Sequence, residues 1–192
     1  MISKRTVDVP GDGSCFFTSL AIAIEHSVDD WREISALCEK MKRLWEEHGE
    51  RTFSASLVRY MCASNVDESI LELYNAEATL SRTRKSLATT SDLSNHIMQS
   101  TTWGDHASLF AFVKSLDYLC GVLIHNTELA DKFVYLPPEW TRNKIRYIVL
   151  KYTNRVSHYE VYKFQNKHYS IPKIWVKRAF LDSSKILQQM LD

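Results

Sequence analysis

The first half of the chain carries apolar residues at helical spacing. The clearest helical face follows Asp29 and Asp30, either of which can cap the helix, and it ends before Gly49. Its apolar positions are Trp31, Ile34, Leu37, Cys38, Met41, Leu44 and Trp45. The same spacing predicts helices over residues 56–61, 67–80, 92–99 and 105–116, whereas the Ser-, Thr- and Lys-rich residues 81–91 predict a surface loop.

The second half changes to the patterns of β-strands. Residues 119–124 form a short apolar run typical of a buried strand, and residues 132–136, 145–152 and 158–164 are rich in aromatic and β-branched side chains. Residues 165–167 predict a hairpin turn into a short strand over 168–171, and Ser183 or Ser184 can cap a helix over 185–191. Helices followed by strands predict an α+β fold with a small mixed sheet packed between helices. At 192 residues we expect one domain over 1–192, with a C-terminal helical extension over about 172–192.

Composition and charge narrow the function classes. The net charge is +1 and the basic stretches at 82–85 and 173–178 are short, so neither nucleic acid nor a membrane is expected as a partner. No segment approaches the run of about 20 apolar residues that spans a bilayer, and residues 1–10 lack the apolar core of a secretory signal. The four cysteines are far apart, with no Cys-x-x-Cys pair and no histidine at ligand spacing. We therefore expect no metal and no disulfide, but reduced thiols in a cytoplasmic setting.

The segment around Cys15 joins a glycine-rich turn to the start of an apolar helix. The run Pro10-Gly11-Asp12-Gly13 ends abruptly, which places Cys15 in the first helical turn. Unpaired N–H groups and the positive end of the helix dipole favour a thiolate there. The glycines let backbone amides of Gly13, Ser14 and Cys15 turn inward, where they can form an oxyanion hole. The alternative interpretation is a small buried cysteine at an ordinary helix start.

A nucleophilic thiol needs a base, and two of the seven histidines are candidates. His125 and His158 each lie at the end of a predicted strand. His158 is the better candidate, because it opens its strand directly after a polar loop and Glu160 lies one pleat away on the same face. A carboxylate there can orient the imidazole and stabilise the imidazolium. The alternative is that His158 and Glu160 are ordinary residues of a solvent-facing strand.

Three motifs, in this order, resemble the ovarian-tumour (OTU) family of deubiquitinating cysteine proteases. The family's Asp-Gly-x-Cys followed by aromatic residues matches Asp12-Gly13-Ser14-Cys15-Phe16-Phe17. Its Trp-Gly before a helix is similar to Trp103-Gly104, and its closing His-aromatic-(Asp or Asn) is similar to His158-Tyr159-Glu160. The chain departs from the family at Glu160, for which Asp12 is the alternative carboxylate. It departs again at Ser108, near the place where the family has an acidic residue.

The resemblance implies a papain-like cysteine protease fold that hydrolyses the isopeptide bond after the C-terminal glycine of ubiquitin. Cys15 would attack, His158 would act as base, and Trp103, Gly104 and Tyr159 would border the ubiquitin tail. A helical arm over about residues 51–99 would bind ubiquitin or polyubiquitin, and no cofactor is implied. The open alternatives are a protease for another ubiquitin-like modifier or a viral polyprotein, and a ubiquitin-binding fold without turnover. We expect a monomer that acts in the cytoplasm, or in the host cytosol if the chain comes from a pathogen.

Overall fold

The computed structural model describes residues 4–27, 35–48, 54–81, 83–128, 133–136, 145–164 and 169–172. Its helices are α1 (Cys15–Ser27), α2 (Ser35–His48), α3 (Ala55–Ala63), α4 (Glu68–Leu80), α5 (Thr90–Met98) and α6 (His106–Ser115). Its strands are β1 (Lys4–Val7), β2 (Cys120–Asn126), β3 (Phe133–Leu136), β4 (Arg146–Thr153), β5 (His158–Phe164) and β6 (Ser170–Pro172), with a short 3₁₀ turn over Asn154–Val156. Helices therefore precede most of the sheet in sequence, and the predicted α+β fold is confirmed.

Side-chain caps set the beginnings of several helices. Asp67 accepts a hydrogen bond from the Ile70 N–H at the start of α4, and Asp105 does the same for Ser108 at the start of α6. At α5, Thr89 and Asp92 form a reciprocal capping box, so this helix begins two residues earlier than the apolar spacing predicts. The predicted caps Asp29, Asp30 and Gly49 lie outside the described residues, as do the hairpin turn at 165–167 and the helix over 185–191.

The strands form one mixed sheet in the order β1-β5-β4-β2-β3, with β6 paired to β4. The β2–β4 pair is parallel and the other pairs are antiparallel. β1 was not predicted, because the four residues Lys4–Val7 show no apolar run and become a strand only by pairing with β5. The last predicted strand is found two residues later, as β6.

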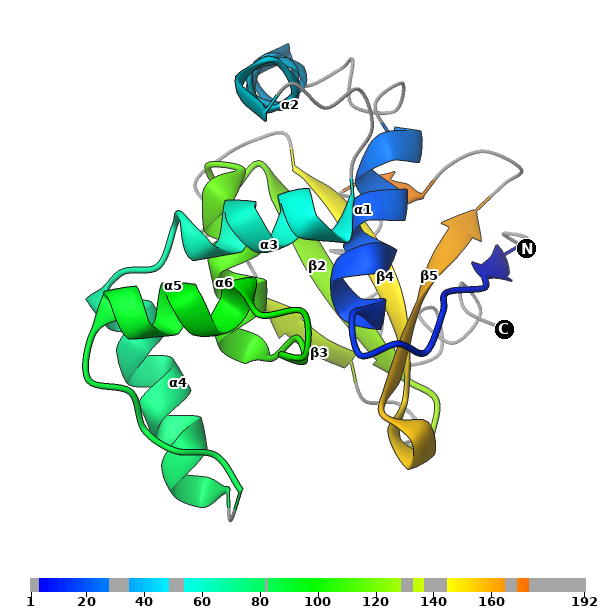
Figure 1. The fold of residues 1–192 in the computed structure, drawn as a ribbon. Coiled ribbons are helices and arrows are strands. Elements are labelled where there is room, and N and C mark those ends of the chain that lie inside the picture. Colours follow the sequence, from blue (N-terminus) through cyan, green and yellow to red (C-terminus); the bar gives the residue numbers. More distant parts are fainter. Residues whose placement is uncertain are drawn as a thin grey trace.

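The hydrophobic core lies between the helices and one face of the sheet. Phe16, Phe17, Leu20 and Ile24 of α1 pack in one cluster with side chains of α3, α6, β2, β4 and β5. Figure 1 shows α1 lying over β4 and β5, while α4 and α5 lie together at one side, away from the sheet. Within the described ranges, no helix is long and apolar enough to cross a bilayer. The start of α1 is thereby held beside β5. Of the helices in the predicted arm over 51–99, α4 and α5 lie at the side of the core and form the arm, whereas α3 packs against α1 and α6.

Candidate active site

A tight turn before α1 sets the position of Cys15. Gly13 has a φ of +82°, a conformation that favours glycine, and the Asp12 Oδ1 atom accepts a hydrogen bond of 2.9 Å from the Ser14 N–H. The Ser14 carbonyl accepts the first helical hydrogen bond, from the Thr18 N–H at 2.9 Å. Cys15 is therefore the first residue of α1, as predicted, and only 6% of its surface is exposed.

The start of β5 lies against this turn. The Tyr159 N–H donates to the Cys15 Sγ atom at 3.5 Å. A methyl group placed on Gly11 would lie 4.0 Å from the Nδ1 atom of His158, so the imidazole is next to the same loop. His125, the other candidate base, is instead hydrogen bonded through Nδ1 to the Tyr162 hydroxyl at 2.7 Å. The structure thus brings Cys15 and the predicted strand start at His158 together.

Glu160 does not bond to His158 in the part of the chain that the structure describes. Its carboxylate forms a 2.6 Å ion pair with the Lys151 ammonium group, and the β4–β5 register sets these two residues directly opposite each other. Opposed residues on neighbouring strands have Cβ atoms about 5 Å apart, whereas residues one pleat apart on one strand are separated by about 6.6 Å. The cross-strand partner is therefore nearer to Glu160 than His158 is.

The Trp103-Gly104 motif lies on the other side of the nucleophile turn. The Trp103 indole is 54% exposed, and its Nε1 atom would lie 3.5 Å from a methyl group on Gly13. Gly104 packs so closely against the Phe16 ring that a methyl group there would lie 2.1 Å from Phe16 Cδ1. Trp103 is half exposed, so it is not a core residue.

A small pocket of about 220 Å³ runs between this motif and β5. Its aromatic wall is formed by Phe16, Trp103, Tyr152 and Tyr159. Its lining also includes the charged or titratable side chains of Glu77, Arg84, Asp105 and His106. Arg84 forms ion pairs there with Glu77 at 3.4 Å and with Asp105 at 3.2 Å. The pocket is therefore lined both by residues next to Cys15 and by a charged cluster that includes Glu77 of α4.

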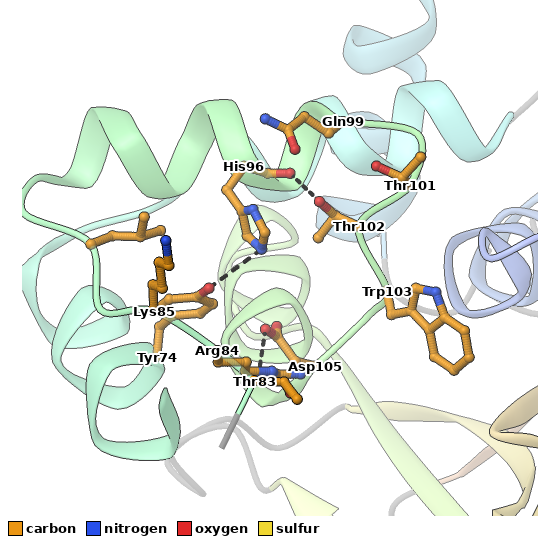
Figure 2. Close-up of a pocket in the computed structure, with 11 residues that line it drawn as sticks. Tyr74, Thr83, Arg84, Lys85, His96, Gln99, Thr101, Thr102, Trp103 and Asp105 are labelled. Atoms are coloured by element: carbon orange, nitrogen blue, oxygen red, sulfur yellow. Dashed lines mark hydrogen bonds and ion pairs between the residues drawn. The ribbon is translucent and has the colours of Figure 1, made fainter. Parts of the chain in front are cut away.

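A second pocket of about 470 Å³ lies between α4, α5 and the segment before Trp103. Figure 2 shows Tyr74 and His96 facing each other inside it, with a 3.4 Å hydrogen bond, and Trp103 at its edge, apart from them. Arg84, Trp103 and Asp105 line both pockets. Lys85 is exposed in the larger one and has no ion-pair partner among the described residues.

One residue near the turn, Arg59, was not predicted from the sequence. Arg59 of α3 is 3% exposed and donates to the Ser14 Oγ atom at 3.1 Å. It is the single charged residue in the helix sequence ASLVRYMCA, and that isolation was the available sign of a special role.

Across the described ranges, no group of three or more His, Cys, Asp or Glu side chains is arranged to hold a metal ion.

The fold is similar to solved structures of OTU domains. An OTU domain in complex with ubiquitin has a TM-score of 0.58 at 16% identity, covering 97% of this chain and 87% of that chain. An h/ceOTUB1 structure with ubiquitin aldehyde and UBCH5B~Ub has a TM-score of 0.55 at 13% identity, covering 85% of this chain and 78% of that chain. An OTU deubiquitinase from Wolbachia pipientis wMel bound to ubiquitin has a TM-score of 0.50 at 14% identity, covering 85% of this chain and 98% of that chain.

Comparisons by sequence give no relative. No protein-family model matches the chain, and no curated protein matches it. The three motifs were therefore the sequence-based indication of this fold, and the fold that they predicted is the fold observed. The chain has the fold of the OTU family.

Proposed function

We propose that this protein is a cysteine isopeptidase that cleaves after the C-terminal glycine of ubiquitin, with Cys15 as nucleophile and His158 as base. The observation that carries the proposal is the 3.5 Å contact between the Tyr159 N–H and the Cys15 Sγ atom, with His158 beside Gly11 of the same turn. The OTU fold supports the proposal, because similar solved structures include complexes with ubiquitin.

The reaction begins when His158 takes the proton of the Cys15 thiol. The Sγ atom forms a bond to the carbonyl carbon of the ubiquitin glycine, and the carbonyl oxygen becomes an oxyanion. Collapse of this intermediate breaks the C–N bond, and the lysine amine leaves with the proton from His158. Water then attacks the thioester, transfers a proton to His158, and releases the glycine carboxylate and the Cys15 thiol.

Backbone amides of the turn are proposed to hold the oxyanion. The Ser14 N–H is already bonded to Asp12, so the amides of Gly13 and Cys15 are the candidates. Asp12 then acts by keeping the turn in shape, since its side chain is exposed and bonded to the turn's own backbone.

The ubiquitin tail is proposed to lie in the 220 Å³ pocket and the body of ubiquitin on the arm of α4 and α5. The pocket is small, and its lining includes Trp103, Phe16, which follows Cys15, and Tyr159, whose N–H donates to the Cys15 Sγ atom. A diglycine tail has no side chains and suits such a small pocket. The larger pocket in Figure 2 presents the Lys85 ammonium group, beside the hydrogen-bonded pair Tyr74 and His96, to a substrate that covers the arm.

A panel of ubiquitin chains, incubated with wild type and Cys15→Ala, tests the proposal. We expect cleavage by wild type and none by the variant. His158→Gln should also be inactive, while His125→Gln, which lies at the Tyr162 contact, should retain cleavage in its folded fraction. A protein that binds ubiquitin but neither cleaves it nor reacts with a ubiquitin suicide probe is a binding module, and the proposal is then wrong. Cleavage confined to another modifier would change the substrate but not the chemistry.

A further inference from the structure

Arg59 is a buried cation that joins three segments of the site. Its Nη1 atom donates to the Ile97 carbonyl at 2.9 Å, at the end of α5. Its Nη2 atom donates to the Ser14 Oγ atom at 3.1 Å and to the carbonyls of Ser100 and Thr102 at 3.1 and 2.8 Å. The guanidinium also lies 3.9 Å from the centroid of the Phe17 ring of α1. One side chain of α3 therefore contacts the nucleophile turn, α1 and the segment that leads to Trp103.

The charge of Arg59 has an unusual environment. Among the described residues no carboxylate lies within ion-pair distance, so neutral oxygens and an aromatic ring take the place of a counter-ion. Burial lowers the pKa of Arg59, and the nearby Cys62 and Asp12 act in the opposite direction. Taking a charge out of water costs free energy even where hydrogen bonds satisfy it, and an apolar residue in this place in α3 would avoid that cost. The side chain therefore requires an explanation beyond packing.

We propose that Arg59 is a positioning residue for the reaction: it holds the Asp12–Cys15 turn and the Ser100–Thr102 segment in fixed alignment across the site. This inference rests on the proposed function of Cys15. Ser14 is the connecting residue, because its N–H bonds to Asp12, its hydroxyl bonds to Arg59, and its carbonyl starts α1. Loss of the guanidinium leaves the Ile97 and Thr102 carbonyls without this donor, and leaves one long hydrogen bond of 3.4 Å, from the Ser14 hydroxyl to the Ser100 carbonyl, between the turn and the Ser100–Thr102 segment.

The geometry requires a planar fork. Nη1 and Nη2 serve acceptors on different segments while the plane packs over Phe17. A lysine ammonium group is a point charge that cannot reach the same set of acceptors or stack in the same way. Arg59→Lys therefore keeps the charge but loses the alignment, and charge and alignment can be tested separately.

The expected result for Arg59→Lys is a fall in kcat of about 100-fold, the loss typical of a misplacement of about 1 Å at a reacting centre. KM for a ubiquitin substrate should change little, because the arm is not altered. Ser14→Ala should lower kcat less, and the double variant should lose less than the product of the two single losses. In Arg59→Ala, guanidinium at low millimolar concentration should restore part of kcat, whereas urea should not.

Met61→Ala is the matched control, because Met61 is a buried residue of the same helix with 1% exposure. It should lower the melting temperature and leave kcat per folded molecule unchanged. If Arg59→Lys cannot be obtained folded, Ser14→Ala and guanidinium rescue still decide the question. Wild-type kcat in either Arg59→Lys or Ser14→Ala overturns the proposal, as does equal rescue by urea.

The proposed function can fail separately. The rate of Cys15 alkylation by chloroacetamide, measured against pH, requires no ubiquitin. If wild type does not cleave ubiquitin but Arg59→Lys slows this alkylation and Met61→Ala does not, the substrate is wrong and the positioning role stands. If both variants alkylate like wild type, the positioning role is wrong.

Discussion

Gly104→Ala should damage both stability and catalysis, because this glycine is in van der Waals contact with the aromatic ring next to the nucleophile. An added methyl group would lie 2.1 Å from Phe16 Cδ1 and 2.2 Å from Phe16 Cγ. Relief to a separation of 3.0 Å needs a shift of 0.9 Å, and Phe16 is only 1% exposed and enclosed by the core. Overpacking of this kind costs about 1–3 kcal/mol. For a chain of this length, that lowers the melting temperature by about 2–12 °C.

The same shift reaches the site through aromatic contacts. The Phe16 ring packs edge-on against the Tyr159 ring with centroids 5.2 Å apart, and the Tyr159 N–H donates to Cys15. We therefore expect kcat per folded molecule to fall by at least 10-fold, since displacements of about 1 Å at a reacting centre cost up to about 100-fold. The measurements are thermal unfolding by circular dichroism and cleavage of a fluorogenic ubiquitin substrate at a temperature where every variant is folded.

Two other glycines supply controls for this prediction. At Gly121 a methyl group would lie 2.2 Å from Tyr147 Cε1, so Gly121→Ala is a comparable clash. Tyr147 is six residues along β4 from Thr153, the partner of His158, so this clash should lower the melting temperature without lowering kcat. At Gly11 the nearest atom is 4.0 Å away, so Gly11→Ala should leave stability unchanged or slightly higher. Wild-type stability for Gly104→Ala would refute the reasoning.

Three further predictions concern the thiols, the carboxylates and the arm. Mild alkylation between pH 6 and 9 should modify Cys15 before Cys62 and Cys120. Burial raises the pKa of the Cys62 and Cys120 thiols, to about 12 for Cys120, and keeps these two protonated. Mass spectrometry that finds Cys62 labelled first contradicts this. Glu160→Gln and Lys151→Met should lower kcat by similar, modest factors if the ion pair supports His158. If Glu160→Ala leaves kcat unchanged and Asp12→Asn lowers it, Asp12 and not Glu160 is the carboxylate that supports the histidine. Lys85→Glu should raise KM for ubiquitin and leave kcat unchanged, whereas Lys42→Glu, on the distant α2, should change neither. If Lys85→Glu lowers the reactivity of the Cys15 thiol as much as it lowers ubiquitin cleavage, the arm supports the fold instead.

Local patterns predicted the helices well because their determinants are local. Asp67 and Asp105 each cap a helix with their own side chains, and the apolar spacing that follows them is visible in any window of the sequence. β1 could not be predicted in this way, because Lys4–Val7 is paired with residues about 160 positions away. The parallel β2–β4 pair has the same difficulty, since a register between distant segments leaves no trace in either strand alone.

The residues of the candidate site also differ in whether a local motif predicts them. Cys15 at a helix start and the strand opening at His158 follow from motifs, and the structure brings them together. The partner of Glu160 does not follow, because Lys151 becomes its neighbour only through the β4–β5 register. Arg59 was missed for a related reason: its acceptors at Ser14, Ile97 and Thr102 are far from it in sequence.

Residues outside the reactive pair also suggest how the rival function, ubiquitin binding without turnover, would arise on the same fold. Cys15 and His158 are the proposed reactive groups, whereas Gly104 and Arg59 pack where they would control how the turn, α1 and the start of β5 are aligned. A substitution at position 104 or 59 would leave Cys15 and His158 unchanged in the sequence. It would displace them relative to each other by about 1 Å, which can lower kcat by about 100-fold. A relative that keeps the Cys15 and His158 motifs but has a bulkier residue at position 104, or an apolar residue at position 59, should therefore bind its modifier and hydrolyse it slowly. Restoring glycine or arginine at that single position should recover kcat without changing affinity.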